Sequence, residues 1–291
     1  MKLGLFLPTA SPIANPEWLL TVAAEVEQRG VDTVWIPEHV VQFEDYESRY
    51  PYSPDGKIPV PPSSGMLEPT TTLAFLAAAT KTVRLGTAIC LLAQRNPVYA
   101  AKELSTLDWL SSGRVDLGVG VGWLREEYEA IGVPWARRGQ RTEDCIAVLK
   151  TLWCDHVSSF TGDTFTLPEC SMYPKPVQQP HPPIHFGGES DAAIGRAARI
   201  GQGWHTFGRL PADVPDALER LDRELDRAGR TRADFQVTVC PYLSPITPEM
   251  VDQYAQAGVD QLSLMLMAFS PSDVAPQLDY MEPYFERVRK T

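Results

Sequence analysis

The sequence has few cysteines, no long apolar run and no block of basic charge, and each absence narrows what the protein can be. Its five cysteines are odd in number and scattered, and no two form a CxxC pair. That pattern predicts reduced thiols in a cytoplasmic protein rather than a disulfide framework. No apolar run approaches the roughly 20 residues that cross a bilayer. The opening MKLGLFLP is stopped by Pro8, which is typical of a first strand and not of a signal peptide.

Charge and missing motifs exclude further classes of function. The formal net charge is −11, which disfavours a nucleic-acid or anionic-membrane partner. The five histidines show no HExxH or other metal-ligand spacing, so no metal site is predicted. A GxSxG elbow, which would indicate a serine hydrolase, is also missing. The first strand continues into LFLPTASP instead of GxGxxG, which disfavours an open dinucleotide-binding sheet.

What the sequence does contain is a regular alternation of short apolar runs and helical segments. Parallel strands that are covered on both faces read as continuous apolar runs. Eight such units close most naturally into a TIM (β/α)8 barrel, whose typical length is about 250 residues. Residues 1–291 are therefore predicted to form a single α/β domain. Strands are expected at 2–8, 32–37, 83–92, 115–119, 184–186, 204–207, 235–243 and 261–268, and helices at 16–29, 69–81, 97–111, 126–131, 140–153, 192–200, 213–228, 248–257 and 272–287.

Two segments exceed what an ordinary barrel needs. Residues 42–68, after the second strand, are rich in Pro, Ser, Tyr and Asp and are too long for a simple connection. Their tyrosines, Tyr46, Tyr50 and Tyr52, favour an ordered active-site loop over disorder, since aromatics are scarce in disordered segments. Residues 157–182 are predicted to form a small hairpin and a proline-rich connector before the fifth barrel strand.

The segment Pro183–Trp204 combines a buried strand, a glycine turn and a helix start. Gly187 and Gly188 allow a tight turn, and Ser190 stands where a helix N-cap is expected. Free backbone N–H groups and the helix dipole then favour a phosphate or a carboxylate, although every βα loop has a turn and a cap. Further polar and glycine-rich segments follow other strands, at the barrel end where TIM-barrel chemistry lies. They are residues 38–39, 94–96, 118–123 and 205–209.

Several segments, in the right order, carry a family resemblance. They are WIPEHV at Trp35–Val40, SRYPYSPDGK at Ser48–Lys57, the long run Leu85–Glu127, PKPVQQPHPPIHFGGES at Pro174–Ser190 and GQGWH at Gly201–His205. On these motifs the chain resembles the luciferase-like monooxygenase superfamily, and within it the deazaflavin-dependent oxidoreductases. The resemblance runs nearly end to end, although residues beyond about Arg209 contribute little.

The resemblance implies a flavin or a deazaflavin, coenzyme F420, in the mouth of the barrel. It places Glu38 and His39 beside the ring. It also implies a bulge with a non-prolyl cis peptide under the central ring, at Ala88, Ile89 and Cys90. The implied phosphate cup comprises Gly122, Trp123, Gly187, Gly188, Glu189, Ser190 and Arg209. The first βα loop, residues 9–15, lacks the acidic residue of the family's sugar-phosphate dehydrogenases, which argues against that reaction.

These implied roles compete with plainer ones. His39 can give or take a proton near neutral pH, or can simply bond a neighbouring carbonyl. Glu38 can orient that imidazole or cap a strand end. Cys90 can touch the ring or be a buried, inert thiol. Arg209 can bind phosphate or lie solvated in a loop, and Trp123 can stack on a cofactor or pack the rim. The same two choices apply to Trp204, and Arg125 can reach a cofactor's tail or face water.

Three functions therefore stay open at this stage. The first is hydride transfer between F420 and a small organic substrate. The second is an FMN-dependent monooxygenase reaction with reduced flavin and oxygen. The third is a flavin-binding barrel without catalysis. The resemblance also implies a homodimer formed through barrel helices, whereas the substrate itself cannot be read from the sequence.

Overall fold

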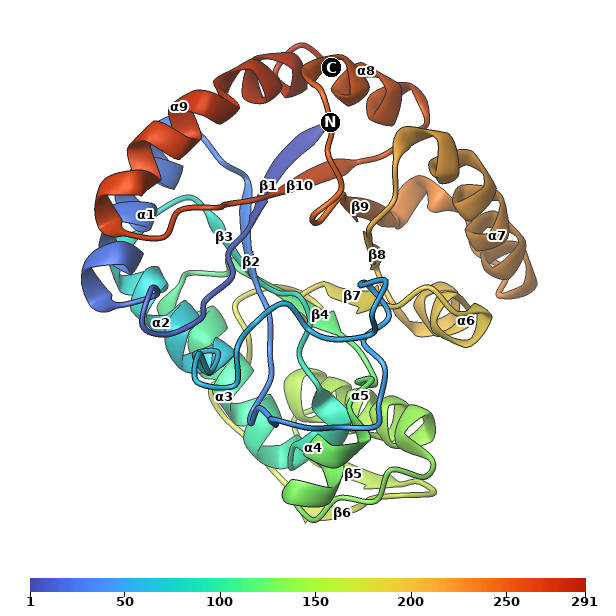
Figure 1. Ribbon diagram of the computed structural model, residues 1–291. Helices are drawn as coiled ribbons and strands as arrows, with labels where there is room; N and C mark the ends of the chain where they lie inside the picture. The colour runs from blue at the N-terminus through green and yellow to red at the C-terminus, as the bar shows by residue number, and fades with distance from the viewer.

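A computed structural model describes residues 1–291 as a closed barrel of eight parallel strands ringed by helices (Figure 1). The order around the barrel is β1-β10-β9-β8-β7-β4-β3-β2, and every neighbouring pair is parallel. The predicted TIM barrel is thus confirmed. The barrel strands are β1 Lys2–Phe6, β2 Thr33–Ile36, β3 Arg84–Thr87, β4 Val115–Val119, β7 Ile184–Gly187, β8 Gly203–Phe207, β9 Gln236–Cys240 and β10 Gln261–Met265.

The helices begin at the signals that the sequence carries. Asn15, Asn96 and Ser190 are N-caps whose side chains accept hydrogen bonds from the first turn of the helix that follows. No helix is both long and apolar enough to cross a bilayer. The helices are α1 Pro16–Arg29, α2 Pro69–Ala79, α3 Pro97–Leu110, α4 Arg125–Ala130, α5 Arg138–Cys154, α6 Asp191–Ile200, α7 Val214–Arg227, α8 Pro248–Gln256 and α9 Pro271–Val288.

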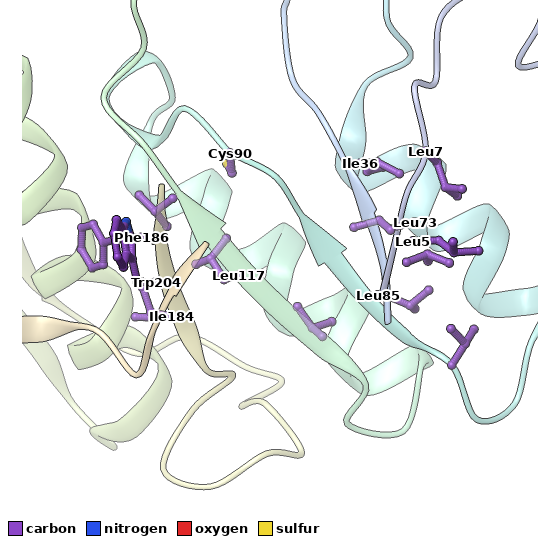
Figure 2. Packing of buried hydrophobic residues seen from close by; sticks show 14 of the residues in the cluster. Leu5, Leu7, Ile36, Leu73, Leu85, Cys90, Leu117, Ile184, Phe186 and Trp204 are labelled. Carbon is purple, nitrogen blue, oxygen red and sulfur yellow. The ribbon is translucent and has the colours of Figure 1, made fainter. Parts of the chain in front are cut away.

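Side chains alternate between the two faces of the barrel wall. Leu5, Leu85 and Leu117 belong to the large apolar cluster between strands and helices, which Figure 2 shows together with Leu73 of α2. Phe6, Trp35, Ala88 and Cys240 form a separate, smaller cluster with Phe207, Tyr242 and Met265. This alternation follows from the two-residue period of a strand, and it leaves the inward positions to fill the barrel.

The barrel interior is packed around the indole of Trp35. A Cβ at Gly86 would lie 2.2 Å from that ring, so only glycine leaves room for it. The indole N–H donates to Gln261 Oε1 at 2.8 Å, which satisfies the buried donor. The rings of His185 and His205 contact the indole edge-on from β7 and β8. Burial and the neighbouring His185 lower the pKa of His205 to about 3, so His205 is a neutral filler of the core.

The third strand is shorter than the predicted 83–92. It leaves the ladder after Thr87, bulges at Ala88 and Ile89, and rejoins β4 at Cys90, whose N–H donates to the Gly118 carbonyl at 2.7 Å. The Ala88-Ile89 peptide is cis, as the resemblance implied. The bulge therefore lies at the carboxyl end of β3, where it faces the mouth of the barrel.

Both predicted insertions are present. Residues 42–68 contain no helix or strand and cross over the barrel mouth in Figure 1. The hairpin consists of β5 Ser158–Thr161 and β6 Thr166–Cys170, an antiparallel pair outside the barrel sheet. It packs beside α5 and precedes β7, the fifth barrel strand. All five cysteines are free thiols.

Candidate active site

A cavity of about 800 Å³ opens at the carboxyl ends of the barrel strands, beneath the loop of residues 42–68. This volume is near the upper end of the ~300–1,000 Å³ that ligand pockets occupy, so it has room for a cofactor and a second small molecule. Gly122 and Gly188 both line it, although 65 residues of other structure separate them in the chain. The two predicted glycine turns therefore meet at one cavity.

The β3 bulge forms part of the cavity floor. Ala88 and Ile89 line the cavity, and the Ile89 side chain packs closely against two glycines. A Cβ at Gly120 would lie 1.7 Å from Ile89 Cδ1, and one at Gly187 would lie 2.8 Å from Ile89 Cγ2. Both glycines are thus required by close packing, and together they keep the floor free of further side chains. An apolar floor of this kind fits one face of a planar ring system.

His39 lines the cavity and is held on both sides of its ring. The Trp123 indole N–H donates to Nε2 at 3.3 Å, and Nδ1 lies 3.4 Å from Glu127 Oε1. An acceptor role for Nε2 places the proton of the neutral ring on Nδ1, facing the carboxylate. His39 therefore does not bond a neighbouring carbonyl, and its role in proton transfer stays a prediction.

The carboxylate that faces His39 is that of Glu127 on α4, which the sequence interpretation missed. Glu127 is fully buried and also accepts from the Val40 N–H at 2.6 Å and from Gln94 Nε2 at 2.9 Å. Burial acts to raise the pKa of Glu127, but interaction with His39, Gln94 and Val40 outweighs it and holds the pKa below its usual range. Glu127 is therefore a buried anion that faces Nδ1 of His39, although the 3.4 Å approach does not form a hydrogen bond in this structure.

Glu38 does not orient the imidazole, so that suggestion from the sequence is corrected. Its carboxylate accepts from the Leu91 N–H at 2.7 Å and pairs with Arg95, whose guanidinium also reaches Glu68 at 2.7 Å. Since Leu91 follows the β3 bulge by two residues, Glu38 anchors the chain that forms the cavity floor. Its negative charge is neutralised there by Arg95.

Cys90 is a buried thiol that does not line the cavity. Burial, with the Glu38 carboxylate close by, raises the pKa of Cys90 well above its usual value. The thiol is therefore protonated and unreactive, as the plainer of the two interpretations held.

The opposite end of the cavity is polar and suits an anion. Ser190 caps α6 and lines the cavity beside Gly188, whose φ of 104° only glycine adopts readily. Two arginines that the sequence interpretation missed, Arg138 and Arg196, line the same end. The Nε of Arg138 is buried without any hydrogen-bond partner, and its guanidinium lies 3.6 Å above the Trp135 ring. A buried donor with no acceptor points to an anionic group as its missing partner.

Arg209, in contrast, is engaged by partners within the protein. It pairs with Glu189, donates to Thr206 Oγ1 at 2.9 Å, and does not line the cavity. Glu189 does line it, with its charge matched by Arg209. Trp204 donates its indole N–H to the Gly188 carbonyl at 2.9 Å and is fully buried in the large apolar cluster, so it neither stacks in the cavity nor packs the rim. Arg125 pairs with Glu129 on the surface, so it faces water.

Aromatic side chains from the long loop close the remaining side. Tyr50 contacts Trp123, with ring centroids 5.2 Å apart, and Tyr52 contacts Phe207 at 5.5 Å. Tyr242, after β9, contacts both tyrosines. Tyr46 contacts Trp123 and accepts a hydrogen bond from the Ile58 N–H, but it does not line the cavity.

Nowhere in the molecule do three or more His, Cys, Asp or Glu side chains form a group able to hold a metal ion.

Two solved enzyme structures share this fold. The fold matches a monooxygenase from Streptomyces bottropensis at 21% identity (TM-score 0.76, 100% of this chain and 99% of the other). It also matches an F420-dependent secondary alcohol dehydrogenase at 20% identity (TM-score 0.78, 99% and 98%).

Sequence comparison gives closer relatives. An uncharacterized protein of Mycobacterium tuberculosis is 32% identical over 86% of this chain and 85% of its own length. The FMNH(2)-dependent dimethylsulfone monooxygenase of Pseudomonas putida is 38% identical over 148 residues, which are 48% of this chain and 40% of that enzyme. The family model for luciferase-like monooxygenases matches residues 1–280. The chain therefore belongs to the luciferase-like monooxygenase family.

Proposed function

We propose that the protein is an oxidoreductase that binds coenzyme F420 in the cavity and transfers a hydride between F420 and a small organic substrate. One observation carries this proposal: an apolar floor, a histidine between Trp123 and Glu127, and an arginine whose buried Nε has no partner line a single cavity. The floor suits a planar ring, and the arginine suits the anionic tail of the same molecule. The family and its F420- and FMN-using members support a redox cofactor at this place.

Bound F420 would supply the hydride chemistry, and the chain's own residues would supply the rest. Ala88 and Ile89 support the ring from below. Gly122, Gly188 and Ser190 leave space and N–H groups for the phosphate, with Arg138 and Arg196 as its counter-charges. His39 holds or moves a proton on Nε2, with Trp123 bonding that nitrogen until a ligand displaces it. The loop of residues 42–68 excludes water from the cavity.

FMN is the second candidate, and a specific observation favours it. The 38% match to an FMNH(2)-dependent monooxygenase is higher in identity than the 32% match to the mycobacterial relative, although it spans half of this chain. In that case the same floor and arginines would hold reduced flavin. A flavin-binding protein without catalysis is the third candidate, which the ordered His39–Glu127 pair disfavours.

Titration of the purified protein with F420 and with FMN, each followed by calorimetry and by quenching of tryptophan fluorescence, tests the proposal. We expect F420 to bind and FMN to bind more weakly. Tight binding of FMN without binding of F420 would replace the first candidate by the second. If neither binds, both fail. If F420 binds and the His39→Ala variant turns over a substrate as fast as the parent protein, His39 has no part in the reaction.

We also propose that the protein forms a homodimer through α3. This helix exposes Tyr99, Trp109 and Leu110, and exposed Tyr173 and Val177 lie next to it in the connector before β7. Lys102 of α3 donates to the Tyr173 carbonyl, and the Val177 N–H donates to Asp108, so helix and connector form one surface. Clustered large apolar side chains of this kind are typical of protein interfaces.

A further inference from the structure

Few of the side chains that line the cavity are charged, and most of these are paired within the protein. Among all lining residues only Glu38, His39, Arg138, Glu189 and Arg196 have acidic or basic side chains. Three of them are matched within the protein, since Glu38 pairs with Arg95, Glu189 with Arg209, and Arg196 with Glu143 at 2.9 Å. The free cation, Arg138, lies at the end that we assign to the cofactor's phosphate.

The rest of the wall consists of uncharged side chains, and we call it the lid-side compartment. The charge beside it is that of the Glu189–Arg209 pair, which adjoins Tyr52 and the Phe207 N–H and is neutral as a pair. The compartment is lined by Phe6, Tyr50, Tyr52, Phe207, Tyr242 and Met265, contributed by the long loop and by the ends of β1, β8, β9 and β10. The rings are in mutual contact, with Phe6 and Phe207 centroids 5.3 Å apart. The compartment adjoins His39 through Trp123, which contacts both His39 and Tyr50.

The tyrosines of this compartment are protonated and carry no negative charge. Burial raises the pKa of Tyr50, of Tyr52 and of Tyr242 above the usual phenol value. Their hydroxyls are therefore neutral hydrogen-bond groups throughout the physiological range. The charges of Glu189 and Arg209 beside Tyr52 neutralise each other, so a charged ligand placed among these rings would lose its hydration without gaining a free counter-charge.

The entrance of the cavity is also apolar. Leu243, Met267 and Phe269 line the cavity and are also exposed to solvent, at 51%, 37% and 62%. Exposed apolar side chains at the rim of a cavity allow an apolar molecule to enter without crossing a charged ring of residues.

We infer that the lid-side compartment binds an uncharged, mainly apolar molecule with a single polar oxygen function, which hydrogen-bonds to the tyrosine hydroxyls near His39. This inference rests on the proposed function, because it assigns the other end of the cavity to the cofactor. It excludes carboxylates, phosphates, amines and sugars as substrates, since their charged or multiple polar groups would be left unpaired in the compartment.

Calorimetry with two probes of equal shape, 2-acetylnaphthalene and 2-naphthoate, tests this inference on the protein with and without saturating F420 or FMN. We expect the ketone to bind at least about 100-fold more tightly than the carboxylate. The Met267→Lys variant adds an ammonium at the rim and should improve naphthoate binding about fivefold. The matched Leu20→Lys variant, on the exposed face of α1 outside the cavity, should leave both affinities unchanged.

The outcomes separate the inference from the proposed function. If a cofactor binds but naphthoate binds within about threefold of the ketone, or if neither probe binds, the inference is overturned and the proposed function stands. If the ketone is preferred but neither cofactor binds, the compartment is as described and the proposed function fails. An equal gain of naphthoate affinity in Leu20→Lys would also overturn the inference, since charge at the rim would then have no special effect.

Discussion

The Ile89 side chain occupies the space that a side chain on Gly120 would need, with its Cδ1 only 1.7 Å from the position of a Gly120 Cβ. The two residues come from the bulge after β3 and the loop after β4. Because Ile89 also presses on Gly187, one isoleucine joins three strand ends at the floor of the cavity. The shape of the floor therefore depends on glycine at positions that carry no chemistry of their own.

Substitution Gly120→Ala should consequently disturb the floor. Ile89 must move to admit the new methyl group, and overpacking of this kind costs about 1–3 kcal/mol of unfolding free energy. We expect a lower urea midpoint and weaker cofactor binding. Gly65→Ala is the matched control, because a Cβ there meets no atom within 4 Å. Equal stability and cofactor affinity of the two variants would contradict this account of the floor.

Glu127 should act on catalysis through His39 rather than on cofactor binding. In Glu127→Gln the side chain keeps its size but loses the negative charge that faces Nδ1 of His39. We expect kcat to fall by roughly 10–100-fold, which is part of the 10²–10⁴-fold that general acid–base catalysis supplies. The Kd of the cofactor, measured by titration, should stay within about twofold.

The control for this variant lies two residues further along the same helix. Glu129→Gln removes a surface carboxylate that pairs with Arg125 and should leave kcat unchanged. A fall in cofactor affinity without a fall in kcat would assign Glu127 a purely structural role.

The stability of the barrel in acid should depend on Glu27. Its carboxylate accepts from the backbone N–H groups of Lys81, Thr82 and Val83 at 2.7–2.9 Å, and so joins α1 to the start of β3. Burial opposes ionisation, but these donors outweigh it and lower the pKa of Glu27 from 4.5 to about 2.

A folded-state pKa below the unfolded value stabilises the protein above pH 4.5, and this contribution is lost as the pH falls toward 2. Glu27→Gln should therefore be less stable than the parent at pH 7, with a difference that narrows between pH 5 and pH 2. Urea unfolding at a series of pH values measures it. The exposed Glu286→Gln, which has no ion-pair partner, should show no such pH-dependent difference. If the difference in unfolding free energy between Glu27→Gln and the parent stayed constant with pH, the hydrogen bonds of Glu27 would not depend on its charge.

The α3 surface offers a test of assembly. Trp109→Glu introduces a charge where the proposed partner subunit would bury an indole, so we expect a dimer of the parent protein to dissociate into monomers. Light scattering after gel filtration reports the mass. Leu20→Glu on α1 is the control and should leave the mass unchanged. A monomeric parent protein, or a dimeric Trp109→Glu variant, would refute this interface.

The sequence predicted the barrel because each strand–helix unit is encoded locally, by apolar runs, caps and prolines. The residues of the site were predictable only where a motif marks them, as with the bulge at Ala88 and Ile89. Glu127 lies within a recognised segment, yet nothing in the sequence shows that α4 turns its carboxylate back onto His39. Arg138 carries no local signal either, since its meeting with Arg196 depends on how α5 and α6 stand on the barrel.

Substitution of Arg138 gives the sharpest test of the proposed phosphate-binding end of the cavity. Arg138 has a buried Nε without an acceptor, and a charged hydrogen bond to phosphate is worth about 1.5–3 kcal/mol. Arg138→Gln should therefore weaken binding of the phosphate-bearing cofactor by roughly 10–100-fold, and the remaining affinity should depend less on salt. Its neighbour Arg137, which pairs with Asp163 on the surface, supplies the control Arg137→Gln, for which no change is expected. Equal losses in both variants would mean that general surface charge attracts the cofactor, and undiminished binding in Arg138→Gln would place the phosphate elsewhere in the cavity.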